Sequence, residues 1–242
     1  MTAMRPSSAG WLLLAALGGG VAGAAMLYLA APHIPVARTQ TEAIVRDYIL
    51  AHPEILPEAM KRLQAKESGQ LVARHRPALE TPFEGAWAGA QNGDVTLVMF
   101  TDYSCGYCRA SAADVDRLLA DDKKLKVVWR EIPILGPGSE AASRAALAAA
   151  QQGRYLDFHR RMFAAGPPDE DRIARVLDET GVSPAAGQDR AQIGEEIENN
   201  LSLARDLGMT GTPTFVIEDQ VLQGAVGYDA LKDAIAKARK SS

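Results

Sequence analysis

The most constraining feature of this sequence is an apolar strand that runs directly into a pair of cysteines. Residues 94–101 contain the near-continuous apolar run Val-Thr-Leu-Val-Met-Phe, which is typical of a strand buried on both faces. Cys105 and Cys108 follow at once, and a helical pattern continues from Cys105 to about Ala120. The two cysteines therefore lie at the junction between a core strand and a helix.

This junction suits thiol chemistry. Ser104 is predicted to cap the helix, which places Cys105 in the first turn. There the unpaired backbone amides and the helix dipole favour the thiolate of Cys105, which is the nucleophilic form. Cys108, three residues later, shares a helix face with Cys105, so the two sulfurs can reach bonding distance.

These are the only two cysteines in the chain of 242 residues, so a disulfide scaffold is impossible. A bridge across two residues would close almost no loop and would add little stability. Haem attachment would need His directly after the second cysteine, where Arg109 stands. A zinc site would need further ligands, and the four histidines are far from the pair in sequence: His33, His52, His75 and His159. No metal site is predicted, and exchange chemistry is preferred to two inert buried thiols.

Residues 9–31 carry no charged side chain and are long enough to cross a bilayer. Arg5 on the short side places the N-terminus in the cytoplasm. The small residues Ala22-Gly23-Ala24 resemble a signal-peptidase site, so cleavage stays open beside the uncleaved inner-membrane anchor that we favour. In either case residues 1–38 direct the rest of the chain to the far side of the membrane.

Residues 39–78 are predicted to form a helical stalk of two helices, with a break at Pro53. An apolar stripe at helical spacing follows the break: Ile55, Leu56, Ala59, Met60 and Leu63. The stripe could face a partner chain, or the two helices could fold back on their own domain. The spacing alone leaves both interpretations open, because the stripe fades after Leu63.

The remaining elements complete a small sheet covered by helices. They are predicted as a strand, a helical block, a hairpin of two strands and a closing helix: 125–132, 139–207, 213–217 with 221–224, and 228–240. This order indicates an α/β fold with a helical insertion. The formal net charge is −4 and the basic residues are scattered, so no nucleic acid partner is expected.

Residues 100–109 read Phe-Thr-Asp-Tyr-Ser-Cys-Gly-Tyr-Cys-Arg and resemble the active-site segment of DsbA-like thioredoxin-fold proteins. Further stretches are similarly placed: 133–150, 153–163 and 204–215. The resemblance covers about residues 85–240. It implies a thioredoxin-like domain over 79–242, with a helical insertion at about 138–208.

The resemblance also implies a function. A periplasmic thiol–disulfide oxidoreductase would act on envelope proteins through Cys105 and Cys108, without a cofactor, and a membrane redox partner would reset the pair. Oxidase, isomerase and reductase share these residues. Gly106 and Tyr107 bring no positive charge to stabilise the thiolate, which argues against an extreme oxidant. The alternative is a membrane-tethered module that binds copper(I) or client proteins, because two thiolates suit a soft metal.

The resemblance assigns roles outside the cysteine motif as well. It makes Pro213 a cis-proline that faces the active site, with the Thr212 backbone pairing with an extended substrate. Residues 45–56 resemble the N-terminal helical region of the ScsC-type subgroup, which implies a homo-oligomer assembled through residues 39–75.

One position departs from the family pattern. Family members often carry a buried acid six positions before the first cysteine, where this chain has Met99. Proton transfer is therefore unassigned. Asp102 is acidic and nearer to the pair, but it can equally finish the strand at the surface.

Overall fold

The computed structural model describes residues 35–183 and 190–241. The chain divides into two compact units, Met1–Arg62 and Leu63–Ser242. The predicted membrane segment, residues 9–31, lies outside the described residues. Within them, no helix combines the length and the apolar character that a bilayer crossing requires.

The stalk consists of two helices, as predicted. Helix α2 (Pro35–Ala51) ends just before Pro53, and helix α3 (Ile55–Glu80) begins just after it. Helix α3 continues past the boundary at residue 78 that the sequence predicted, and its greater part, from Leu63 onward, belongs to the second unit. Val72 and Leu79 are buried there against the sheet, which is why the second unit includes the end of this helix.

Five strands form one sheet in the order β1-β3-β2-β4-β5. They are β1 (Trp87–Gly89), β2 (Val95–Thr101), β3 (Leu125–Glu131), β4 (Thr214–Ile217) and β5 (Gln220–Gln223). Strands β2 and β3 are parallel, with Val95 opposite Leu125 and Thr101 opposite Glu131. The other pairs are antiparallel. Strand β1 was not predicted, because three residues in a Pro- and Gly-rich segment carry no periodic signal.

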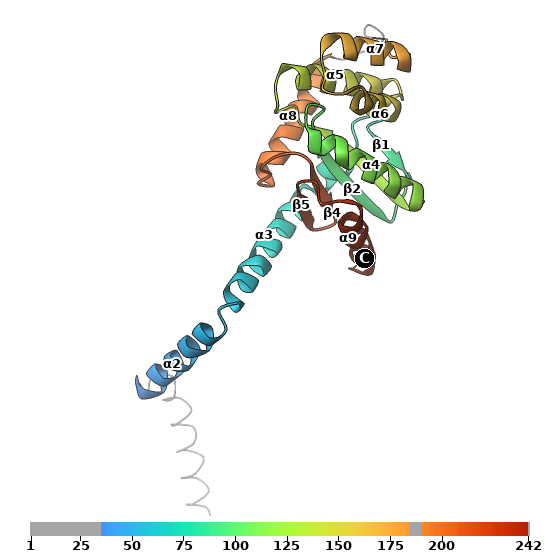
Figure 1. The fold of residues 1–242 in the computed structure, drawn as a ribbon. Coiled ribbons are helices and arrows are strands. Elements are labelled where there is room, and N and C mark those ends of the chain that lie inside the picture. Colours follow the sequence, from blue (N-terminus) through green and yellow to red (C-terminus); the bar gives the residue numbers. More distant parts are fainter. Residues whose placement is uncertain (1–34, 184–189, 242) are drawn as a thin grey trace, which may run out of the picture. The chain divides into compact units, whose positions relative to one another are not determined.

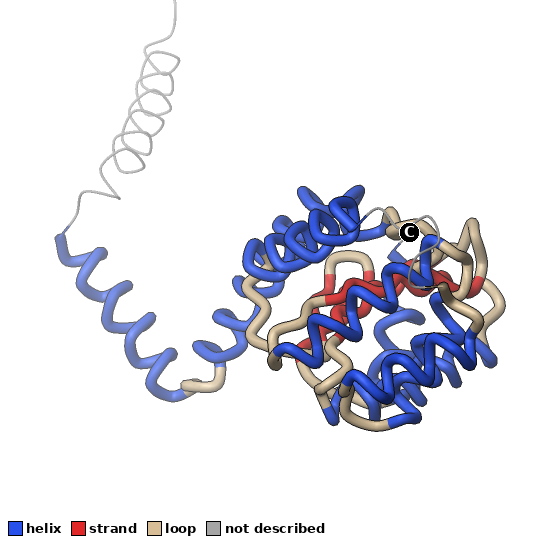
Figure 2. Tube along the Cα trace, turned by 90° about the horizontal axis from the view of Figure 1, so that it is seen from above, coloured by secondary structure: helices blue, strands red, loops and turns tan. Residues whose placement is uncertain are grey.

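Helices cover both faces of the sheet (Figures 1 and 2). Helices α4 (Gly106–Asp121) and α9 (Tyr228–Ser241) pack on one face, together with the first helices of the insertion. The insertion runs between β3 and β4 as α5 (Pro137–Gln151), α6 (Tyr155–Ala165), α7 (Glu170–Thr180) and α8 (Arg190–Asp206). The predicted α/β fold with a helical insertion is confirmed.

Alternate residues of β2 pack into two separate hydrophobic cores, one on each face of the sheet. Leu97 and Met99 lie in the core beneath α4, whereas Val98 and Phe100 lie in the core against α3 and α8. Successive side chains of a strand point to opposite faces, so a strand covered on both sides must be apolar throughout. This requirement explains the continuous apolar run before the cysteines.

Arg130 ties the end of α3 to the sheet. This β3 side chain is only 3% exposed. Its guanidinium donates to the carbonyl oxygens of Ala78, Leu79 and Thr81 and to the Glu196 carboxylate on α8. The last carbonyls of a helix have no partner within the helix, and here one buried cation satisfies several of them.

We predict that Arg130→Leu destabilises the fold by about 3–5 kcal/mol, because it leaves buried carbonyls without a donor and the Glu196 carboxylate without its cation. Urea unfolding followed by circular dichroism measures this loss. The control is Arg239→Leu, which removes a more exposed ion pair with Asp94 and should cost much less. Equal losses for the two variants would contradict the role given to Arg130.

Candidate active site

Cys105 is held at the N-terminus of α4. It is the N-cap residue of the helix, and its sulfur accepts the Cys108 backbone N–H at 3.3 Å. The Cys105 thiol also lies 3.3 Å from the Thr212 carbonyl oxygen. A backbone N–H donor and a carbonyl acceptor therefore both lie within hydrogen-bond distance of the reactive sulfur. Both cysteines are free thiols.

The predicted cap was wrong by one residue. Ser104 was expected to cap α4, but the Cys105 side chain takes that role. Ser104 is committed elsewhere: its amide donates to Asp102 Oδ1 at 2.8 Å, and its hydroxyl lies 2.7 Å from the hydroxyl of Ser139. The nucleophile itself therefore occupies the capping position.

The two sulfurs lie in different environments. Cys105 retains 6% of its exposure, whereas Cys108 has none. Burial raises the pKa of the Cys108 thiol to about 12. Cys105 is therefore the sulfur that a client can reach, and Cys108 is placed to act from inside.

The other predicted site residues surround Cys105. Thr212 and Pro213 lie just before β4, and the peptide bond between them is cis. Tyr107 is 72% exposed beside the nucleophile. Gly106 faces open space, since a Cβ added there would meet no atom within 4 Å. The structure thus brings together all six residues that the sequence singled out.

Asp102 does not finish the strand at the surface, as one interpretation of the sequence held. Its side chain is fully buried. The carboxylate accepts the amide of Ser104 and, at 2.9 and 3.0 Å, the amides of Ile134 and Leu135. The Ser139 hydroxyl donates a further hydrogen bond, at 2.6 Å. This buried carboxylate is stabilised because four donors surround it.

The sequence reasoning missed a second buried acid, Glu131, at the end of β3. Tyr155 donates a hydrogen bond of 2.6 Å to one of its carboxyl oxygens, and Ser143 donates one of 3.0 Å to the other. Burial nevertheless raises the pKa of Glu131 from 4.5 to about 8. The signal was an acidic residue at the end of a strand that is buried at nearly every position, paired with Thr101 in the parallel ladder.

The hydrogen bonds continue from Tyr155 towards the nucleophile. The Tyr155 hydroxyl lies 3.4 Å from Nδ1 of His159, and the hydroxyl of Tyr103 lies 3.0 Å from the same nitrogen. Burial lowers the pKa of His159 to about 3, so its ring is neutral. A string of buried polar groups therefore connects Glu131 to the segment just before Cys105.

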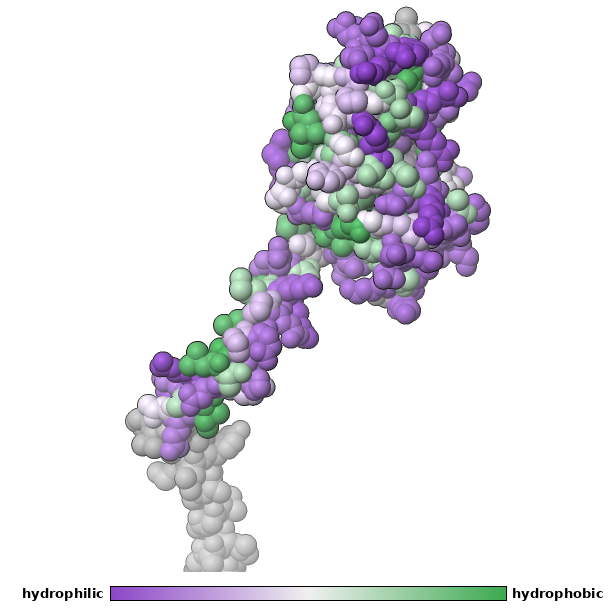
Figure 3. Space-filling view, in the orientation of Figure 1, coloured by the Kyte–Doolittle hydropathy of each residue, from purple (hydrophilic) through white to green (hydrophobic). Residues whose placement is uncertain are grey.

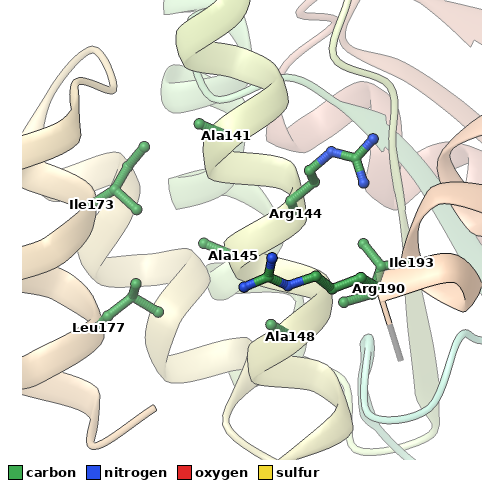
Figure 4. Close-up of a pocket in the computed structure, with 8 residues that line it drawn as sticks. All are labelled: Ala141, Arg144, Ala145, Ala148, Ile173, Leu177, Arg190 and Ile193. Carbon is green, nitrogen blue, oxygen red and sulfur yellow. The ribbon is translucent and has the colours of Figure 1, made fainter. Parts of the chain in front are cut away.

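A cavity of about 480 Å³ lies apart from the cysteines, between α5, α7 and α8. Figure 4 shows its apolar lining and the two arginines beside it, Arg144 and Arg190. The cavity contains none of the predicted site residues. In residues 35–183 and 190–241, no group of three or more His, Cys, Asp or Glu side chains is arranged to hold a metal ion.

A Cys-x-x-Cys pair that begins a helix after the second strand of such a sheet, opposite a cis-proline, defines the class of thioredoxin-fold proteins with a thiol–disulfide site. Comparison with known families agrees: residues 96–236 match the DSBA-like thioredoxin domain. Residues 38–70 match the copper resistance protein ScsC N-terminal domain. The chain therefore belongs to the DsbA-like thioredoxin-domain family of thiol–disulfide oxidoreductases, with an ScsC-type N-terminal region.

Solved structures support this placement. A linker-deletion mutant of Proteus mirabilis ScsC shares 30% identity, covers 86% of this chain and 98% of its own, and superposes with a TM-score of 0.69. A thioredoxin-like oxidoreductase from Silicibacter pomeroyi shares 41% identity over 64% of this chain and 92% of its own, with a TM-score of 0.61.

The curated relatives include much longer proteins. The Na(+)/H(+) antiporter NhaA 3 of Salinispora tropica is 29% identical over 165 residues, which is 64% of this chain. The chain spans about a quarter (24%) of that antiporter's length.

We predict that Glu131→Gln removes a pH dependence of stability. The folded protein keeps the Glu131 proton up to about pH 8, whereas the unfolded chain releases it near 4.5. Stability from this group is therefore complete below pH 4.5 and is lost as the pH rises to about 8. The loss should be on the order of a few kcal/mol. Urea unfolding at several pH values measures it.

The Gln variant should show a flatter profile between these two pH values, because its amide does not ionise. Glu140→Gln serves as the control, because Glu140 is an exposed carboxylate on α5. If wild type, Glu131→Gln and Glu140→Gln all gave the same slope, the buried carboxyl would not hold a proton.

Proposed function

We propose that this protein catalyses thiol–disulfide exchange on the cysteines of other proteins, through Cys105 and Cys108. The observation that carries the proposal is the setting of the Cys105 sulfur, between the Cys108 amide and the Thr212 carbonyl. The amide holds the sulfur at the N-terminus of α4, and the backbone near Thr212 can accept an extended client segment. A binding module would need neither arrangement.

The reduced pair can act on a client disulfide. The Cys105 thiolate attacks one client sulfur, a mixed disulfide forms, and the other client sulfur leaves as a thiolate that takes up a proton. If a client thiolate then attacks the mixed disulfide, the bonds are rearranged without net electron transfer. If Cys108 attacks instead, it gives up its proton, the client gains two electrons and the pair becomes oxidised.

The oxidised pair can act in the opposite direction. A client thiolate attacks Cys105, Cys108 leaves, and a second client thiolate releases a client disulfide. Two electrons then reside on the enzyme and must pass to another disulfide, for which we propose a membrane redox partner. We favour isomerase or mild oxidase action, because Gly106 and Tyr107 bring no positive charge to the thiolate. The location that we propose is the bacterial periplasm, with residues 9–31 as the targeting or anchoring segment.

The direct test is activity on a protein with scrambled disulfides, measured beside copper(I) titration of the reduced enzyme. We expect native disulfides to be regained with a catalytic amount of protein. Tight copper(I) binding without any exchange activity would favour the binding module instead.

We predict that Cys108→Ala accumulates mixed disulfides with envelope proteins, because the thiol that resolves them is absent. Cys105→Ala should accumulate few, since Cys108 is buried and its pKa is raised to about 12. Non-reducing gels of periplasmic extracts, with and without dithiothreitol, detect these species. Equal trapping by both variants would contradict the roles assigned here, in which Cys105 forms the mixed disulfide and Cys108 resolves it.

We also propose a homo-oligomer formed through residues 39–75. Apolar side chains along α2 and the first half of α3 are exposed (Figure 3). They are Ile44, Val45, Tyr48, Leu50, Leu56, Met60 and Leu63. Large exposed apolar side chains in such number are typical of an association site, and residues 38–70 match the copper resistance protein ScsC N-terminal domain.

We predict that Leu56→Glu with Met60→Glu lowers the particle mass to that of one chain, because charges would be buried at the interface. The matched control adds negative charge on the opposite side of the helix, through Lys61→Glu with Ala65→Glu, and should leave the mass unchanged. Light scattering on the chain from residue 33 measures both. A monomeric wild type would contradict the oligomer and leave the stalk as a spacer.

A further inference from the structure

The cavity between α5, α7 and α8 contains neither cysteine, but it has the size of a small-molecule site. Its volume is about 480 Å³, and ligand sites in proteins typically measure about 300–1,000 Å³. Of the described residues that line it, six are apolar and two are arginines. The apolar residues are Ala141, Ala145 and Ala148 on α5, Ile173 and Leu177 on α7, and Ile193 on α8. The cavity thus combines an aliphatic lining with positive charge.

Contacts at both ends of α5 hold this helix and the segments that flank α7 in place, and the cavity lies between them. Near the start of α5, a Cβ added at Gly138 would lie 2.6 Å from the carbonyl oxygen of Pro168, so the two backbones touch. After the end of α5, the Gln152 side chain makes hydrogen bonds of 3.1 and 3.0 Å with the backbone of Ser183. Between these contacts α5 lines the cavity with alanine methyl groups and Arg144. A preformed site of this kind costs little entropy to occupy.

The two arginines, Arg144 and Arg190, lie on the side of the cavity that α8 forms (Figure 4). Arg144 belongs to α5, but a Cβ added at Gly194 of α8 would lie 3.7 Å from its Nη1, so its guanidinium reaches α8. Arg190 is four residues before Gly194, and residues at this spacing share a helix face. Figure 4 shows its side chain extended from α8 towards α5. One side of the cavity is therefore charged, and the side formed by α7 is apolar.

Both guanidinium groups are able to bind an anion. Arg144 donates a hydrogen bond of 3.0 Å to Glu140, but its Nη1, which is directed at α8, takes no part in that pair. Within residues 35–183 and 190–241, no carboxylate forms an ion pair with Arg190. The described residues that line the cavity include no acidic side chain. An anion in the cavity would therefore meet two cations and no like charge in the lining.

We propose that this cavity binds an aliphatic carboxylate, with its head group on Arg144 and Arg190 and its chain along Ile173 and Leu177. A planar guanidinium suits a carboxylate, because its parallel N–H groups match the two oxygens. The rest of the lining is aliphatic, so a ligand with further hydroxyl or amide groups would bury them without partners. Exchange at the cysteines does not require this site, which gives the helical insertion a function of its own.

The test is photolabelling of the full chain with a decanoate analogue that carries a diazirine at the far end of its chain. Peptide mapping should place the label within residues 173–177 or 141–148, where the chain end lies. Decanoate should prevent this labelling, and decanol, which has the same chain without the charge, should compete at least tenfold more weakly. Octanoate should compete about 16-fold more weakly than decanoate, because each buried methylene strengthens binding about fourfold.

Arg190→Gln should raise the decanoate concentration needed for half competition about tenfold, because it removes a charged hydrogen-bond donor. Arg175→Gln is the matched control, since it makes the same change at an exposed position of α7 that does not line the cavity. Ala145→Leu keeps both arginines but fills space in the cavity, so it should reduce labelling about tenfold. Cys105→Ala should be labelled like the wild type. Circular dichroism shows whether each variant is folded, and Ala145→Leu keeps the test valid if Arg190→Gln is not.

Three results would overturn the proposal. The first is label confined to other parts of the chain, such as the exposed apolar side chains of α2 and α3. The second is equal competition by decanol and decanoate, because the arginines would then have no part in binding. The third is unchanged labelling and competition in folded Arg190→Gln and Ala145→Leu.

Discussion

The parallel pairing of β2 with β3 is the contact on which the rest of this unit depends. Both strands are buried on both faces, and their paired ends bring Thr101 beside Glu131. Because parallel strands end at the same edge, the segments that leave them also meet there. The segment after β2 carries Asp102 and Cys105, and the segment after β3 carries Ile134. The active site is thus assembled from two chain segments that the ladder aligns.

Two buried acids, Asp102 and Glu131, lie at this edge of the sheet and have different roles. The carboxylate of Asp102 has four donors and serves as a structural anchor. Glu131 has fewer donors, and burial raises its pKa to about 8, so it remains protonated at neutral pH. Burial is the dominant influence on the pKa of Glu131, and the hydrogen bonds from Tyr155 and Ser143 do not offset it.

The strand, the cysteine pair and the helix after them could be predicted from sequence because their signals are local. The apolar run requires burial on both faces, and the cysteine spacing requires a shared helix face. The errors came from partners distant in the chain. Ser104 has the right chemistry for a cap, but Ser139 lies against its hydroxyl. Asp102 was a candidate surface residue because nothing near it in sequence shows that residues 134–139 bring it donors.

At Gly106 the requirements of packing can be separated from the reduction potential of the cysteine pair. A Cβ added at this position would meet no atom within 4 Å, so core packing does not require glycine there. The residue is nevertheless the immediate neighbour of the reactive sulfur, and each 30 mV in reduction potential corresponds to only about 1.4 kcal/mol. Single substitutions at Gly106 can therefore change the reduction potential of the Cys105/Cys108 pair during evolution, without a compensating change elsewhere in the fold.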